Sequence, residues 1–229
     1  MRCPEIGHDA AVLFELRDVS LSRGGRTVLD SLSADVPAGA TAIVGPSGAG
    51  KSTLLRLLNR LADPDSGAIS FRGEPLDERD PRRLRREVGL VPQLPALLDG
   101  TVRDNLAFAA HLAGRPFDCA RSLRLAGLAA DFADRRVDEL SVGEQQRAML
   151  GRALAQEPTV LLLDEPTAAL DHASRDAVEG ALAELRRELE ISLVLVSHDP
   201  GQARRLGEWA VRLEGGRAIE AGPAAEVLA

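Results

Sequence analysis

The segment GPSGAGKS, residues 45–52, has the residue types and spacing of a phosphate-binding loop. It matches the pattern G-x-x-x-x-G-K-[ST] in full, between an apolar run typical of a strand and a helical pattern. Its glycines let backbone N–H groups curl around phosphates, Lys51 can bridge the β- and γ-phosphates, and Ser52 can ligate Mg²⁺. The alternative is an ordinary glycine turn, but Lys51 is the only lysine of the chain, which favours a site that needs a compact ammonium. The predicted nucleotide-binding residues of this loop are Gly45, Pro46, Ser47, Gly48, Ala49, Gly50, Lys51, Ser52 and Thr53.

Polar side chains follow three further apolar runs. Asp164 and Glu165 follow VLLL, Gln93 follows VGLVP, and His198 follows SLVLVS. Asp164 can hold Mg²⁺, while Glu165 can polarise an attacking water. Gln93 can reach the metal or the water, and His198 can hydrogen-bond the γ-phosphate. The alternatives are an acidic pair that caps the next helix and hydrogen-bonded strand ends. We predict that Glu165, His198 and Gln93 are catalytic. The predicted metal ligands are Ser52, Gln93 and Asp164.

The segment LSVGEQQR, residues 140–147, is typical of the start of a helix. Ser141 can act as N-cap, and Glu144, three residues later, can complete a capping box. Such a helix start presents free N–H groups and the positive end of the helix dipole, which suits a phosphate. The chain already has a phosphate loop, so this helix start points to a phosphate from elsewhere. A capping box that only begins the helix is the alternative.

Short apolar elements must position these residues. The runs TAIV, VGLV, VLLL and SLVLV are typical of strands buried on both faces of a parallel sheet. Because ligands gather at the carboxyl ends of such strands, we expect the four strand ends to converge on one site. VLFELRDVSLS and TVLDSLSADV alternate as antiparallel strands do. From Leu94 to about Pro158 the patterns are mostly helical.

The predicted fold class is α/β: a P-loop NTPase parallel-sheet core with an antiparallel β subdomain and an inserted helical subdomain. We expect a single nucleotide-binding domain over residues 12–229. Within it, residues 12–93 and 158–229 form the core with its β subdomain, and residues 94–157 form the helical subdomain. Residues 1–11 are an N-terminal tail.

Composition excludes some classes of protein. A formal charge of −7 argues against a protein that clamps nucleic acid backbones. Cys3 and Cys119 lie far apart and form no CxxC pair, so neither a disulfide framework nor a metal knuckle is indicated. No apolar run approaches the ~20 residues that a membrane-spanning helix needs. We therefore expect a soluble protein of the cytoplasm.

The chain resembles the ATP-binding cassette ATPases of ABC transporters. The resemblance extends from Phe14 to Gly222 and its motifs occur in family order. They are the Walker A motif at Gly45–Ser52, the Q-loop at Gln93, the signature at Leu140–Gln145, the Walker B motif at Val160–Glu165, the D-loop ending at Asp171, and the switch histidine His198. The resemblance implies ATP and Mg²⁺ as cofactors and ATP hydrolysis as the activity.

The resemblance also implies partners. In this family two cassettes pack head to tail, and each signature helix caps the γ-phosphate held by the other's loop. Ser141 and Gly143 would then bind the partner's nucleotide, and Asp171 would link the two sites. The implied partners are a second copy of the chain and a separate transmembrane permease subunit, with no nucleic acid, at the cytoplasmic face of the cell membrane. Residues 94–108 resemble the region that grips the permease, with ordinary packing as the alternative.

Two positions depart from the family pattern. The usual signature LSGGQ is LSVGE here, with Val142 and Glu144 substituted and Ser141 and Gly143 retained. At the position of the usual adenine-stacking aromatic ring the chain has Arg23. Because a guanidinium plane can stack on a base, we include Arg23 among the nucleotide-binding residues.

The expected function is that of an ATP-binding and hydrolysing subunit, which couples closure of a head-to-tail dimer to solute transport through a separate membrane subunit. One alternative is an ABC-type ATPase that acts on DNA or ribosomes. Such relatives usually carry a long coiled-coil insertion, two cassettes or a basic face, which this chain lacks. A P-loop kinase or GTPase would leave the signature and the D-loop unexplained.

Overall fold

The computed structural model describes residues 11–168 and 170–229, which divide into two compact units. One unit combines the described residues up to Arg85 with Ser192–Ala229, and the other consists of the described residues of Arg86–Ile191. The three-part division predicted from the sequence stays a prediction.

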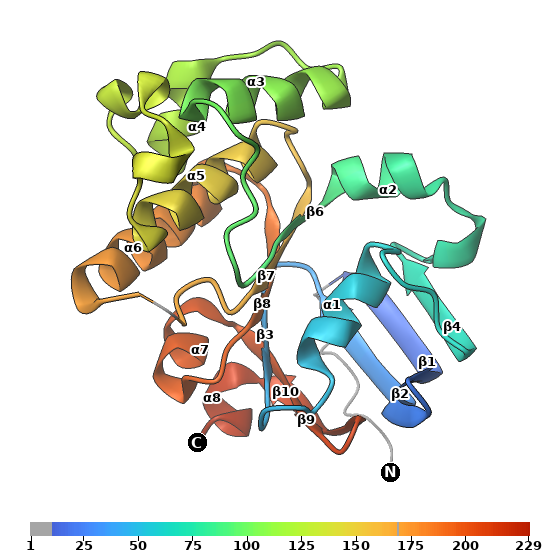
Figure 1. Cartoon of the computed structure of the whole chain (residues 1–229). Coiled ribbons are helices and arrows are strands. Elements are labelled where there is room, and N and C mark those ends of the chain that lie inside the picture. The colour runs from blue at the N-terminus through green and yellow to red at the C-terminus, as the bar shows by residue number, and fades with distance from the viewer. Residues whose placement is uncertain (1–10, 169) are drawn as a thin grey trace. The chain divides into compact units, whose positions relative to one another are not determined.

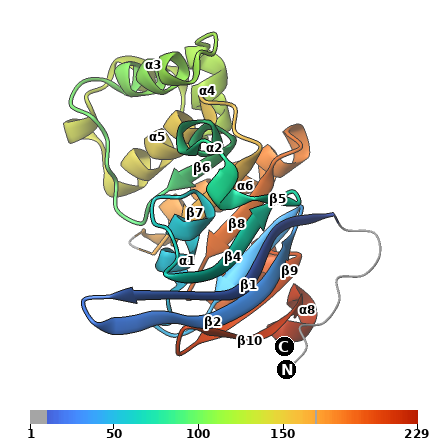
Figure 2. The same cartoon turned by 90° about the vertical axis from the view of Figure 1, so that its right-hand side faces the viewer.

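The first unit contains a four-stranded antiparallel sheet. Its strands, in the order β2-β1-β4-β5, are β2 (Arg26–Pro37), β1 (Val12–Arg23), β4 (Ser66–Phe71) and β5 (Glu74–Pro75). Figure 2 shows β1 and β2 as two long blue ribbons, which are joined by Gly24 and Gly25. Both glycines have positive φ, 57° and 76°, as a two-residue hairpin turn of type I′ requires. The rings of Phe14 and Phe71 pack with centroids 4.9 Å apart in the core. The predicted antiparallel pairing before Gly45 is confirmed.

The first unit also contains parallel strands. In the order β9-β3-β8 they are β9 (Trp209–Glu214), β3 (Ala40–Val44) and β8 (Ser192–Val196). A further strand, β10 (Arg217–Pro223), pairs with β9 in the antiparallel direction. The helices of this part are α1 (Lys51–Leu58), α7 (Pro200–Leu206) and α8 (Ala224–Val227). Every residue of β3 and β8 is buried and the two strands are parallel, as their apolar runs predict. Gly45 and Ser197, the residues that directly follow these two strands, therefore lie at the same edge of the sheet.

The second unit pairs two parallel strands with a group of helices. The strands are β6 (Val88–Val91) and β7 (Val160–Asp164). The helices are α3 (Val102–Ala113), α4 (Cys119–Leu125), α5 (Val142–Leu154) and α6 (His172–Glu188), with 3₁₀ turns η2 (Ala130–Asp134) and η3 (Val137–Glu139). Figure 1 shows α3, α4 and α5 grouped together, and Val102, Leu106, Leu123 and Ala148 form part of their common core. The described part of residues 94–157 is thus mostly helical, as predicted.

Among the described residues, no helix has the length and apolar character that crossing a membrane requires. Cys3 and nearly all of the predicted tail lie outside the described residues, as does Ala169 within the D-loop.

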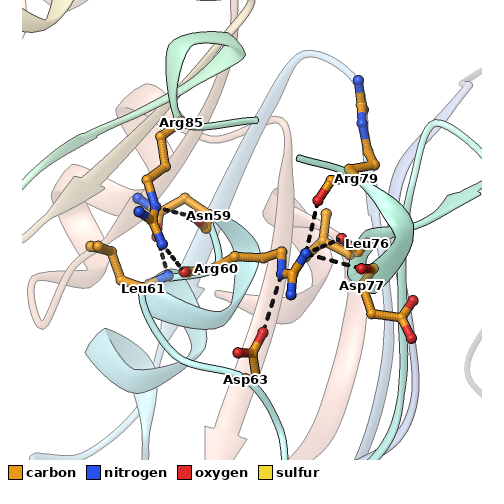
Figure 3. Close-up of polar contacts among 8 residues, drawn as sticks. All are labelled: Asn59, Arg60, Leu61, Asp63, Leu76, Asp77, Arg79 and Arg85. Carbon is orange, nitrogen blue, oxygen red and sulfur yellow. Dashed lines mark hydrogen bonds and ion pairs between the residues drawn. The ribbon is translucent and has the colours of Figure 1, made fainter. Parts of the chain in front are cut away.

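The side chains of Arg60 and Arg85 connect the end of α1 to the segment that leads to α2 (Pro81–Glu87) (Figure 3). That segment contains the 3₁₀ turn η1 (Leu76–Glu78). Nη1 of Arg60 donates to the carbonyl oxygens of Leu76, Asp77 and Arg79 at 3.3, 3.0 and 2.8 Å. Its Nε donates to Asp63 at 3.1 Å. Arg85 in turn donates to the carbonyl oxygens of Asn59 and Arg60. The charged run 77–87 is mostly exposed to solvent, but Arg85 has this structural role as well.

We expect Arg60→Ala to lower the free energy of unfolding by about 2 kcal/mol, because hydrogen bonds from a charged donor contribute about 1.5–3 kcal/mol and the carbonyls would lose their partner. The Arg60 side chain is only 17% exposed, so water replaces it poorly. Urea unfolding measures the change. The exposed Arg82 is the matched control, and its alanine variant should lie within about 0.5 kcal/mol of the parent. Equal stability of the two variants would contradict the structural role of Arg60.

Candidate nucleotide-binding and catalytic site

Glycines shape the loop between β3 and α1 in the first unit. Gly45, Gly48 and Gly50 have φ angles of 146°, 79° and 97°, which favour glycine. A Cβ atom on Gly45 would lie 2.1 Å from the carbonyl oxygen of Leu213. One on Gly50 would lie 2.6 Å from a methyl carbon of Leu29. The loop therefore packs closely against its own unit, and α1 begins directly after it.

Lys51 lies buried at the first position of α1, only 6% exposed. Its Nζ donates to the carbonyl oxygens of Gly45 and Pro46 at 2.7 and 3.0 Å. These two neutral groups hold the ammonium across the loop without cancelling its charge. The site therefore combines three features that suit an anionic phosphate group: glycines with positive φ, the start of a helix, and a cation held in place.

His198 and the start of the phosphate loop line one cavity of about 650 Å³ in the first unit. Gly45, Pro46 and Ser197 contribute to the same cavity. The hydroxyl of Ser197 accepts a hydrogen bond from the backbone N–H of Asp199 at 3.0 Å and lies 2.8 Å from Oε1 of Gln202. His198, between these anchored neighbours, is exposed. The structure thus brings together two residues, Gly45 and His198, that lie far apart in the sequence.

Gln93 and Glu165 lie together in the second unit. They follow β6 and β7, and Nε2 of Gln93 donates to Oε2 of Glu165 at 3.2 Å. Asp164, the last residue of β7, is 6% exposed. The carboxylate of Asp164 and the amide oxygen of Gln93 are hard oxygen donors of the kind that Mg²⁺ prefers. The donor types in this unit therefore fit the predicted metal.

Glu165 has a left-handed backbone, with φ of 47°. Such a conformation is unusual outside glycine and asparagine, and it costs of order 1 kcal/mol or more. Glu157 has a similar conformation, with φ of 54°, so the backbone alone does not mark Glu165 as a functional residue. Nothing in the sequence VLLLDEP signals this conformation.

The predicted capping box at the start of α5 is confirmed. The hydroxyl of Ser141 accepts from the amide of Glu144 at 3.3 Å and donates to the Glu144 carboxylate at 2.8 Å. The amide of Ser141 also donates to that carboxylate, at 2.8 Å. Arg135 donates to it from the other side at 3.2 Å, with its guanidinium 4.3 Å from the ring centroid of Phe132. The negative charge that Glu144 adds to the signature is thus paired with Arg135.

These contacts set the ionisation of Glu144. Burial is the largest influence and would raise its pKa, but the hydrogen bonds from Ser141 and the charge of Arg135 together lower the pKa below the ordinary value of 4.5. A carboxylate with a lowered folded-state pKa stabilises the fold above its unfolded pKa and loses that contribution as the pH falls through the folded value. The box is therefore complete at neutral pH.

We expect Glu144→Ala to lower the free energy of unfolding at pH 7 by about 1 kcal/mol, the usual worth of a helix cap. The difference from the parent should shrink as the pH falls below 4.5, because the parent's carboxylate becomes protonated. Urea unfolding at a series of pH values tests this. Glu144→Gln, which keeps a capping side chain without a titrating group, is the control. A deficit of the alanine variant that stays constant with pH would contradict the prediction.

Asp171 is the N-cap of α6 in the second unit. It accepts a hydrogen bond from the amide of Ser174 at 2.8 Å, which is the main reason that its pKa lies below the ordinary value, and burial only partly opposes this. Arg147 on α5 lowers that pKa further through its charge. Asp171 is therefore an ionised cap between the D-loop and α6.

Arg23 is exposed at the end of β1, beside the Gly24–Gly25 turn. Its predicted stacking on a base stays a prediction. Two other residues of interest were not found from the sequence. Arg135 lies in an irregular segment, where no periodicity relates it to Glu144. The sequence could have identified Ser174 as the N3 residue whose amide donates to an Asp171 cap. No pattern in the sequence signals that Ser174 contacts Gly143.

Comparison with known proteins places the chain in a family. The ABC transporter family model matches residues 29–168, more than half of the chain. Protein STAR1 of Oryza sativa subsp. japonica is 42% identical over 207 residues, which cover 89% of this chain but only 60% of STAR1. The structure of cbiO1 from Clostridium perfringens, part of the ABC transporter complex cbiONQ, has a TM-score of 0.85 at 29% identity, over 95% of this chain and 90% of cbiO1. The ATP-binding cassette MJ0796, in a dimeric structure with ADP and Pi, has a TM-score of 0.81 at 26% identity, over 93% of this chain and 99% of MJ0796.

These likenesses confirm the predicted fold class, the α/β fold of a P-loop NTPase with parallel and antiparallel sheets. The matched family region begins within β2 and runs through the phosphate loop, the signature and the Walker B strand. The chain therefore belongs to the ABC transporter family, as one of its ATP-binding cassettes, the family's ATPase domain.

Proposed function

We propose that this cassette binds and hydrolyses ATP and couples the reaction to solute transport through a separate membrane subunit. The observation that carries the proposal is the phosphate loop, in which the ammonium of Lys51 is held 2.7 Å from the carbonyl oxygen of Gly45. The alternative, an ABC-type ATPase acting on DNA or ribosomes, is not favoured, because the family match is to transporters and the chain has a net charge of −7.

The backbone of residues 45–53 would bind the phosphates of ATP, with Lys51 on the β- and γ-phosphates. Arg23 would stack on the base. Ser52, Asp164 and Gln93 would hold Mg²⁺ directly or through water, and the ion would supply charge neutralisation at the transferring phosphate. Glu165 would orient and deprotonate the attacking water, and His198 would hydrogen-bond the γ-phosphate. The hydrogen bond from Gln93 to Glu165 supports a shared role for these two residues.

Two copies of the cassette would close head to tail around ATP. In the closed state Ser141 and Gly143 would contact the nucleotide of the partner, and Asp171 would lie at the interface. The start of α5 supports this role, because the positive end of the helix dipole suits an anion, although the capping box uses the amides of Ser141 and Glu144. The related cassette MJ0796 has been seen as a dimer with ADP and Pi. ATP binding would stabilise the closed dimer and hydrolysis would release it.

The segment after Gln93, with α3, would dock the membrane subunit. Its exposed apolar side chains are Leu94, Leu98, Phe108 and Leu112. The buried Asn105 anchors the segment, because its side chain accepts from the amide of Leu98 and donates to the carbonyl oxygens of Leu98 and Thr101. A fixed backbone that presents apolar side chains suits a protein partner. The cassette would then lie at the cytoplasmic face of the membrane.

Lys51→Ala tests the proposal. We expect this variant to lose ATP binding by at least about tenfold and to lose ATP hydrolysis, because the phosphates would lose their held cation. Titration with a fluorescent ATP analogue and a phosphate-release assay measure both. Arg56→Ala, on the exposed face of the same helix, is the matched control and should behave as the parent. Unchanged ATP binding by Lys51→Ala would overturn the assignment of Lys51 to the phosphates of ATP.

The transport role is tested separately, by copurification of the cassette with a polytopic membrane protein.

A further inference from the structure

We propose that Ser174 is a positioning residue for the signature segment, and that Gly143 must be glycine because Ser174 on α6 occupies the space of its missing side chain. The inference rests on the proposed role of the signature segment at the nucleotide of the partner. Both residues lie in the second unit, where α5 and α6 run close together (Figure 1).

The contact is a close one. Gly143 is buried in the first turn of α5. A Cβ atom built on it would lie 2.7 Å from both Cβ and Oγ of Ser174 and 3.7 Å from Cδ2 of Leu170. Separations below 3.0 Å essentially never occur for real Cβ atoms. The missing side chain of Gly143 is thus directed at α6 of its own chain, so a packing requirement within one protomer suffices to explain the glycine.

Ser174 is itself held in place. Its amide donates to Oδ1 of Asp171 at 2.8 Å and its hydroxyl to Oδ2 at 3.3 Å. Asp171 ends the D-loop, and Gly143 is two residues from Ser141. A shift of Asp171 that carried Ser174 with it would therefore press on the start of α5, because close-packed atoms transmit displacement. The D-loop and the signature segment are in this way mechanically linked through one serine.

The direction in which Gly143→Ala changes the melting temperature shows whether Ser174 sterically requires a glycine at position 143. Alanine is the better helix former, so without a steric conflict the substitution would raise the melting temperature. With the conflict, we expect a fall of roughly 2–10 °C. Gly180 on α6 is the matched control, because nothing lies within 4 Å of its Cβ position, and its alanine variant should melt at or above the parent temperature.

The second change is Ser174→Gly, which removes the conflicting atoms but keeps the amide that donates to Asp171. All variants are made in the slow-turnover parent Glu165→Gln. For each, the melting temperature, the affinity of the monomer for a fluorescent ATP analogue, and the fraction of dimer by light scattering with Mg²⁺ and ATP are measured. We expect Gly143→Ala to weaken dimerisation on the order of tenfold, while the affinity of the monomer for the ATP analogue stays that of the parent. We expect the double variant, Gly143→Ala with Ser174→Gly, to match Ser174→Gly alone. Its dimer affinity should agree to within about twofold, and its melting temperature to within about 2 °C.

Each outcome decides the proposal. Failure of Ser174→Gly to rescue either property would overturn it, since the methyl group would then be excluded by something other than Ser174. Rescue of the melting temperature without rescue of dimerisation would leave Ser174 a packing residue and overturn the positioning role. If the parent itself stays monomeric, the proposed head-to-tail dimer fails and the positioning role with it, whereas the melting temperatures alone still test the Gly143–Ser174 contact.

Discussion

Glu165→Gln should keep the affinity for ATP and lower the rate of ATP hydrolysis by about 10²–10⁴-fold, the usual contribution of general-base catalysis. Glutamine has nearly the same shape and can still meet Nε2 of Gln93, which now lies 3.2 Å from Oε2 of Glu165, through its own amide oxygen. It cannot take a proton from the attacking water. Phosphate release and nucleotide titration measure the two quantities separately.

The control for this variant is Glu157→Gln. Glu157 also has a left-handed backbone, with φ of 54°, but its carboxylate pairs with Arg115 and Arg121. Turnover of the control should equal that of the parent. Hydrolysis at the full rate by Glu165→Gln would exclude Glu165 as the general base and leave it at most an orienting group.

Ser141→Arg should abolish ATP-dependent dimerisation while each monomer still binds ATP. The substitution removes the N-cap, whose hydroxyl accepts from the Glu144 amide at 3.3 Å, and places a bulky side chain at the helix start proposed to meet the partner's phosphate. Light scattering in the Glu165→Gln background measures the dimer. Loss of more than about tenfold in dimer affinity is expected, because bulk at the centre of an interface blocks close approach.

Thr101→Arg is the matched control for the loss of a cap. Thr101 forms the same kind of box with Asp104 at the start of α3, with its hydroxyl accepting from the Asp104 amide at 3.1 Å. Both variants should lose a similar amount of stability, about 1 kcal/mol. Only Ser141→Arg should lose the dimer. A normal dimer in Ser141→Arg, or equal losses in the two variants, would count against the role of Ser141 at the partner's nucleotide.

The sequence alone determined the local parts of this protein. The phosphate loop, the buried strands β3, β6, β7 and β8, and the capping box of α5 are each specified by residues within about ten positions of one another, and all appear in the structure. Backbone conformation at glycines, apolar runs and caps depends on short-range sterics and hydrogen bonding, which sequence patterns record directly. The family resemblance rests on the same short motifs.

Only the tertiary structure decided the contacts between distant segments. Gln93 meets Glu165 because β6 and β7 are parallel neighbours, and His198 shares a cavity with Gly45 because β8 lies beside β3. The pairing of Arg135 with Glu144 and the contact of Gly143 with Ser174 likewise depend on how helices and irregular segments pack. Such contacts are set by the close packing of complementary surfaces, in which many residues contribute small energies at once, so no short pattern in the chain encodes them.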